Sequence, residues 1–158
     1  MSRRWIPCIS PRLQAAIHAG DLHEAGIQED DIIIQLGDLA INHIVPTAIR
    51  YMTSLVENVR GLKEIFSDLE YERLAGARKE MIITISDHIS NIKKLVNEMI
   101  EERKKANIIE DSFKKALTYE KKVKPYLEQI RYHIDKLELI VDNEIWPLPK
   151  YRELLFTR

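Results

Sequence analysis

The chain has 158 residues, of which 45% are hydrophobic and 31% charged, and its formal net charge is −1. This length suits one domain with its own core, and the composition is globular rather than disordered. The near-neutral balance argues against a nucleic-acid binder, which concentrates basic residues on one face. The single cysteine, Cys8, excludes an internal disulfide.

Segments typical of export or membrane insertion are not expected. Residues 1–5 (MSRRW) contain two arginines, but no apolar stretch follows them as it would in a signal peptide. No run of about 18 apolar residues stands out as a membrane-spanning segment. We therefore expect a cytoplasmic protein that does not contact a membrane.

Glycine and proline are unevenly distributed, and this predicts an all-α fold. No glycine follows Gly76, and the only later prolines are Pro125, Pro147 and Pro149. A strand-rich fold would need more turn residues than this. Near the start, Ser10 and Pro11 predict a short N-terminal helix that ends at Gly20. We treat residues 1–31 as a separate N-terminal segment and residues 32–158 as the helical domain.

The next helix is predicted from about Asp31 to Phe66. Its apolar residues alternate in steps of four and three, which is typical of a helix packed along one seam, as in a coiled coil. Pro46 predicts a kink or a break within it. The seam positions are Ile41, Val45, Ala48, Met52, Leu55, Val59, Leu62 and Phe66.

A capping box at Ser67 and Glu70 predicts a new, short helix that Gly76 interrupts. A longer helix is predicted over residues 77–106, ending at Asn107. Its seam positions are Ile82, Ile85, Ile89, Ile92, Val96, Met99 and Ala106.

The last predicted helix begins after Asp111, with a bend at Pro125 and with Glu120 as the polar exception in its seam. Its seam positions are Phe113, Ala116, Val123, Leu127, Ile130, Ile134, Leu137 and Val141. With the preceding helix it predicts a long antiparallel hairpin that turns near residues 107–111. We expect Ile89 and Ile134 to lie in the core of this hairpin.

A second apolar flank widens the stripe beyond a two-helix seam. The residues of this flank are Ile83, Leu95, Ile100, Leu117, Leu139 and Ile140. The helix over residues 32–66 could cover them in a three-helix bundle, or another chain could cover part of them. Periodicity does not separate these alternatives.

The proline-rich C-terminal tail is unusually apolar for a chain end. It offers large side chains, while two prolines restrict its backbone and lower the entropy cost of docking. It could close its own bundle or dock on a catalytic domain or a neighbouring subunit, and both alternatives are open. The residues predicted to make these contacts are Trp146, Pro147, Leu148, Pro149, Tyr151 and Phe156.

No arrangement of residues predicts catalysis, a metal site or a bound cofactor. The five histidines show no i, i+4 pairing, and Asp87 and His88 are sequence neighbours that point in different directions on a helix. The sequence contains neither a glycine-rich phosphate loop nor a nucleophile elbow. Acidic and basic residues alternate, which favours solvated helix faces.

Six stretches together resemble the region that follows the catalytic domain in type III glutamine synthetase. The ending is the most specific of them, because it carries the rare hexapeptide WPLPKY. The stretches are residues 37–51 (GDLAINHIVPTAIRY), 57–66 (ENVRGLKEIF), 102–107 (ERKKAN), 122–127 (KVKPYL), 130–138 (IRYHIDKLE) and 146–156 (WPLPKYRELLF).

The resemblance implies a parent enzyme that joins glutamate and ammonia using ATP and Mg or Mn, in large cytoplasmic assemblies. The family's ligand-binding and catalytic residues lie upstream of this region, so none of them is carried over to this chain. We expect a C-terminal structural and assembly domain, from a truncated gene or an excised fragment. The alternative is a free-standing helical interaction module without enzymatic activity.

Overall fold

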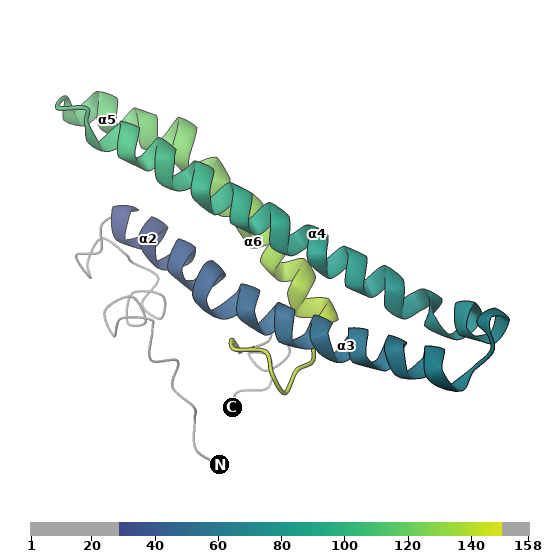
Figure 1. Cartoon of the computed structure of the whole chain (residues 1–158). Helices are drawn as coiled ribbons and strands as arrows, with labels where there is room; N and C mark the ends of the chain where they lie inside the picture. Colours follow the sequence, from purple (N-terminus) through teal and green to yellow (C-terminus); the bar gives the residue numbers. More distant parts are fainter. Residues whose placement is uncertain (1–28, 150–158) are drawn as a thin grey trace, which may run out of the picture.

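A computed structural model describes residues 29–149 of the chain. Every regular element in this range is helical, so the predicted all-α class is confirmed (Figure 1). The predicted N-terminal helix lies outside the described residues, as do Tyr151 and Phe156. Of the predicted N-terminal segment, only residues 29–31 are described, and they belong to the first turn of α2. The elements are α2 (Glu29–Leu39), the π-helix η1 (Ala40–Ile44), α3 (Val45–Ile65), α4 (Asp68–Asn107), α5 (Ser112–Thr118), the π-helix η2 (Tyr119–Val123) and α6 (Lys124–Ile140).

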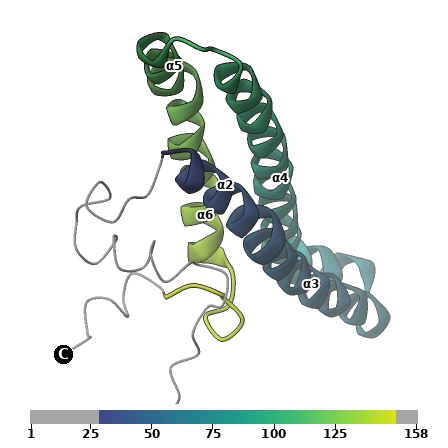
Figure 2. The same ribbon diagram turned by 90° about the vertical axis from the view of Figure 1, so that its left-hand side faces the viewer.

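These elements form three long rods. The first consists of α2, η1 and α3 end to end, the second is α4, and the third consists of α5, η2 and α6. With 40 residues, α4 is the longest, and at a rise of 1.5 Å per residue it extends about 60 Å. It packs against α3 on one side and α6 on another (Figures 1 and 2). The predicted antiparallel hairpin with a third helix is therefore present.

The two prolines inside the described helices, Pro46 and Pro125, each follow a π turn, so neither breaks its helix. The Val45 N–H bonds the carbonyl of Ala40, and the Lys124 N–H bonds that of Tyr119, each across five residues. Pro46 and Pro125 come immediately after these donors. A proline has no N–H, and its ring clashes with the carbonyl four residues earlier. A wider turn accommodates this defect without ending the helix.

The π turns also decide which residues face the core, and here the predicted seam is wrong by one residue. Tyr119 is buried where the four-three pattern placed Glu120, which is exposed. Likewise Ala40 and Ile44 are fully buried, whereas Ile41 is only half-buried. The extra residue of a π turn rotates the side chains that precede it, about the helix axis, relative to those that follow it. A single heptad register therefore cannot describe the residues on both sides of Pro46, or of Pro125.

Helix α4 begins at Asp68 and passes through Gly76 without interruption, so the predicted short helix and restart at residue 77 are wrong. A Cβ at Gly76 would meet nothing within 4 Å, so no tight contact requires a glycine there. A lone glycine costs a helix only about 1 kcal/mol. The predicted capping box is present: the Glu70 carboxylate accepts from the Ser67 N–H at 3.3 Å and from its hydroxyl at 2.6 Å.

The core runs along the middle rod. Most of the predicted α4 seam is fully buried, and Ile134 of α6 is buried opposite it, while Ile89 is half-buried against the same core. The buried set comprises Ile33, Ala40, Ile44, Val45, Ala48, Ile85, Ile92, Val96, Met99, Ala106, Tyr119, Val123, Ile130, Ile134, Leu137, Val141 and Trp146.

The second apolar flank divides into two groups. Leu95, Ile100 and Ile140 pack against the core, as expected for a three-helix bundle. Ile83 and Leu139 are 61% and 81% exposed, and Leu117 is 43% exposed. Three helices therefore cover only half of the flank in the described part of the chain.

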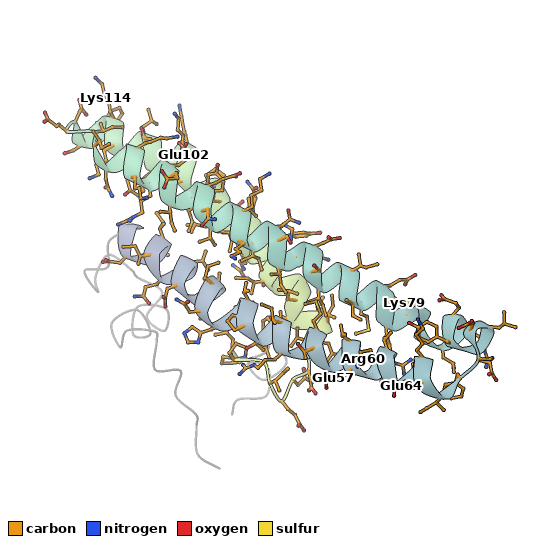
Figure 3. All side chains as sticks on the ribbon, viewed as in Figure 1. Glu57, Arg60, Glu64, Lys79, Glu102 and Lys114 are labelled. Atoms are coloured by element: carbon orange, nitrogen blue, oxygen red, sulfur yellow. The ribbon has the colours of Figure 1, made fainter. Side chains whose placement is uncertain are left out.

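The first rod is also the most apolar one. Its span Asp31–Ile65 is long and apolar enough to cross a membrane, by length and composition alone. From the sequence we expected no membrane-spanning segment, and this span does not fit that expectation. A buried core helix of a soluble protein can, however, be equally long and apolar. In this fold 39% of its most apolar 18-residue stretch is buried. The later part of α3 projects Glu57, Arg60 and Glu64 outward (Figure 3).

Candidate functional site

Charged residues near the end of α4 form surface pairs. Glu101 and Glu102 accept from Lys104 at 2.7 Å and Lys105 at 2.6 Å. Within residues 29–149, no three His, Cys, Asp or Glu side chains are grouped closely enough to hold a metal ion. These side chains are arranged as helix-supporting pairs, which suits a solvated face.

Asp111 has a structural role at the tip of the hairpin. Its carboxylate accepts from the Lys114 N–H at 2.9 Å and so caps the start of α5. On the other side of the turn, the Tyr119 hydroxyl donates to Oδ1 of Asn107 at 3.0 Å. Asp111 thus serves the fold as a helix cap.

Two histidines that are distant in the sequence meet between α4 and α6. Nδ1 of His88 lies 2.9 Å from Nδ1 of His133, and their ring centroids are 5.1 Å apart. Sequence reasoning missed this pair because it compared histidines only within one helix. A signal was available: each histidine directly precedes a seam isoleucine, Ile89 or Ile134, at a similar distance from the hairpin turn.

Partial burial lowers the pKa of both imidazoles. Desolvation is the largest cause for His88; the carboxylate of Asp87 acts in the opposite direction, and Lys136 of α6 lowers the pKa further. For His133, desolvation again comes first, and proximity to His88 adds to it. The surroundings thus favour two neutral rings, of which one donates a hydrogen bond to the other.

Trp146 lies in the segment that follows α6, where it is 7% exposed and belongs to the central core. The backbone N–H of Trp146 donates to the Asp142 carbonyl at 3.1 Å, and the Asp142 carboxylate accepts from the backbone N–H of Glu144 at 2.9 Å. These bonds turn the chain back along the bundle after α6 (Figures 1 and 2). Leu148 also packs against the core.

The other predicted tail contacts vary in burial. Pro147 is half-buried and Pro149 is exposed. Tyr151 and Phe156 lie outside the described residues. The tail up to Leu148 thus packs on its own bundle, whereas docking of the remaining tail on another protein stays a prediction.

Exposed apolar residues gather at both ends of the long α4 rod. We call Ile65, Phe66 and Leu69, at the α3–α4 turn, the first tip; Ile65 is 76% and Leu69 85% exposed. The second tip consists of Ile108 and Phe113 at the α4–α5 turn, with exposures of 80% and 78%. The two turns mark opposite ends of the molecule (Figure 1). Phe66 and Phe113 were predicted to be seam residues, and both predictions are wrong. The α3–α4 turn extends beyond the end of α6, and the α4–α5 turn extends beyond the start of α2, so no third helix covers either turn (Figure 1).

Comparison with known proteins finds a relative that matches most of this chain. A curated glutamine synthetase from Bacteroides fragilis (strain YCH46) is 59% identical over 123 residues, which are 78% of this chain. The resemblance to glutamine synthetase is confirmed. The same match covers only 17% of the glutamine synthetase from Bacteroides, so this chain corresponds to a small part of that protein. No protein-family model matches the chain.

Proposed function

We propose that the chain is the C-terminal helical region of a type III glutamine synthetase, where it provides scaffold and subunit contacts rather than chemistry. The observation that carries this proposal is 59% identity over 78% of the chain to a segment that is 17% of a glutamine synthetase. The assignment to type III rests on the six stretches that resemble that family, above all the ending WPLPKY. The parent would be a cytoplasmic ATP-dependent glutamate–ammonia ligase that uses Mg or Mn.

The two apolar tips support a role in assembly. Exposing a phenylalanine and an isoleucine to water at the end of a helical rod is unfavourable. Covering them with a partner removes their apolar surface from water and so favours association. The tips are separated by about the length of α4, on the order of 60 Å. They can therefore reach two different surfaces, such as the catalytic domain and a neighbouring subunit.

A free-standing interaction module is the second candidate, and the continuous core favours it. Residues of all three rods, for example Ile44, Ile92 and Ile130, are fully buried within this one chain. A domain with its own core can fold and bind a partner without a catalytic region.

Co-expression tests the first proposal. The Bacteroides relative is made without the segment that this chain matches, and the present chain is supplied separately with an affinity tag. We expect the two pieces to co-purify as one large assembly with glutamine synthetase activity. Two well-folded pieces that never associate would contradict the proposal and leave the free-standing module.

A variant with a charge at the second tip and a surface control test which part of the chain makes the contact. Phe113→Asp should weaken co-purification because it places a charge in the covered surface. The control Lys94→Ala lies on the exposed face of α4, where its contact with Glu98 is 4.0 Å long, and should leave association unchanged. Equal association of both variants with the catalytic piece would remove the second tip from the interface.

A further inference from the structure

We propose that His88 and His133 form a proton-controlled latch, in which the neutral pair holds α6 on α4 and a second proton releases α6 together with the Trp146 segment. The latch consists of these two residues only. It is independent of the glutamine synthetase proposal, because it rests on contacts within the chain.

The hydrogen bond between His88 and His133 survives the addition of one proton to the neutral pair, but not of two. In the neutral pair one Nδ1 carries a hydrogen and donates it to the bare Nδ1 of the other ring, 2.9 Å away. A first added proton binds Nε2 of the donor ring, which strengthens the hydrogen bond by charge. A second must bind the acceptor's Nδ1, which removes the bond and leaves two cations in contact.

The surrounding groups do not offset this repulsion. On α4, Asp87 favours the charged form of His88, but Lys136 of α6 opposes it. The Tyr132 ring lies edge-on to His133 at 5.2 Å between centroids, and Lys136 Nζ lies 5.4 Å from the Tyr132 ring. No ionisable residue of α2 or α3 is among the groups that shift either pKa in the described part of the chain. The doubly charged pair is therefore relieved by separation of the helices.

The position of the latch determines what separation releases. His133 lies in the half of α6 that continues through Leu137 and Val141 to Trp146, all of them buried. Beyond Ile140 the chain returns along the bundle without a helix (Figure 1). Loss of the α4–α6 contact at His133 therefore loosens the segment that carries Trp146.

Tryptophan fluorescence of the full 158-residue chain tests the latch. The chain has two tryptophans, so Trp5→Phe leaves Trp146 as the reporter. Between about pH 8 and pH 5 we expect a reversible red shift of the emission, beginning below the ordinary histidine pKa of about 6.5. Carboxylates titrate mainly below this window, so they contribute little to the shift.

Two matched variants assign the shift. His88→Gln with His133→Gln keeps groups that can hydrogen-bond but do not titrate, and we expect the red shift to disappear. The control variant His43→Gln removes a histidine of η1, and we expect it to show the same red shift as the parent chain. An undiminished red shift in the glutamine pair, or none in the parent chain, would overturn the proposal.

Imidazole ¹⁵N chemical shifts provide a second measurement that does not depend on variants. At about pH 8 the latch requires one ring with its hydrogen on Nδ1 and one with a bare Nδ1. Two rings that both carry hydrogen on Nε2 alone would contradict the latch, even if the glutamine pair fails to fold.

Discussion

The Tyr119 hydroxyl donates to the Asn107 side-chain oxygen at 3.0 Å and thereby ties the η2 π turn to the last turn of α4. Tyr119 itself is 6% exposed and belongs to the core. Because the bond spans the hairpin turn, we expect Tyr119→Phe to lower the free energy of unfolding by about 0.5–1.5 kcal/mol. Tyr119→Leu should cost more, since it also removes aromatic packing. Urea denaturation measures the free energy of unfolding of both variants. A Phe variant as unstable as the Leu variant would show that the hydroxyl, and not the aromatic packing, makes the main contribution.

The burial of Ile134 predicts strong sensitivity to charge. Ile134→Asp places an unpaired carboxylate in the core, and the cost should be several kcal/mol, on the order of 3. Ile89→Asp should cost less, because Ile89 is half-buried and its carboxylate can reach water. Circular dichroism melts measure both, with Lys94→Ala as the surface control. Equal melting of the Ile134 variant and this control would mean that the assigned core face is wrong.

Gly37 offers a stabilising substitution. A Cβ at this position would lie 3.5 Å from Val96 Cγ1 and 3.6 Å from Met99 Cε, which is ordinary van der Waals contact. We expect Gly37→Ala to stabilise the fold by about 0.5–1 kcal/mol, because alanine favours the helix. Gly76→Ala is the matched control, with the same helix gain and no new contact. Destabilisation by Gly37→Ala alone in urea titrations would show that α2 lies closer to α4.

The Ser67–Glu70 capping box predicts a pH dependence at the acidic end. Hydrogen bonds from the Ser67 side chain and backbone lower the pKa of Glu70 below its usual 4.5. The stabilisation is therefore present above the pKa of the unfolded chain and is lost as the pH falls through the folded value. We expect Glu70→Gln to lower the melting temperature near neutral pH and to match the parent chain in strong acid. A difference independent of pH would argue against the ionised cap.

The chain by itself should be catalytically silent. With ATP, Mg or Mn, glutamate and ammonia, we expect phosphate release no higher than background, because the sequence offers no phosphate loop or metal-ligand spacing. A preparation carrying Ile134→Asp controls for contaminating enzyme. Turnover that exceeds this control and persists through repeated purification would contradict the assignment to a non-catalytic region.

The sequence alone determined the all-α class, the α4 seam, the capping box and the hairpin turn. These features depend on neighbouring residues: glycine and proline distribution, four-three spacing from Ile85 to Met99, and a helix start at Ser67. The resemblance to glutamine synthetase was likewise readable from short stretches such as WPLPKY.

Tertiary structure decided what depends on how the rods lie against one another. The π turns before Pro46 and Pro125 rotated the inward face, so that Tyr119 replaced Glu120 in the core. The length of α4 relative to its neighbours left Phe66 and Phe113 at exposed tips. His88 and His133 met only because two helices packed side by side, and contacts between distant segments are set by packing rather than by the spacing within either helix.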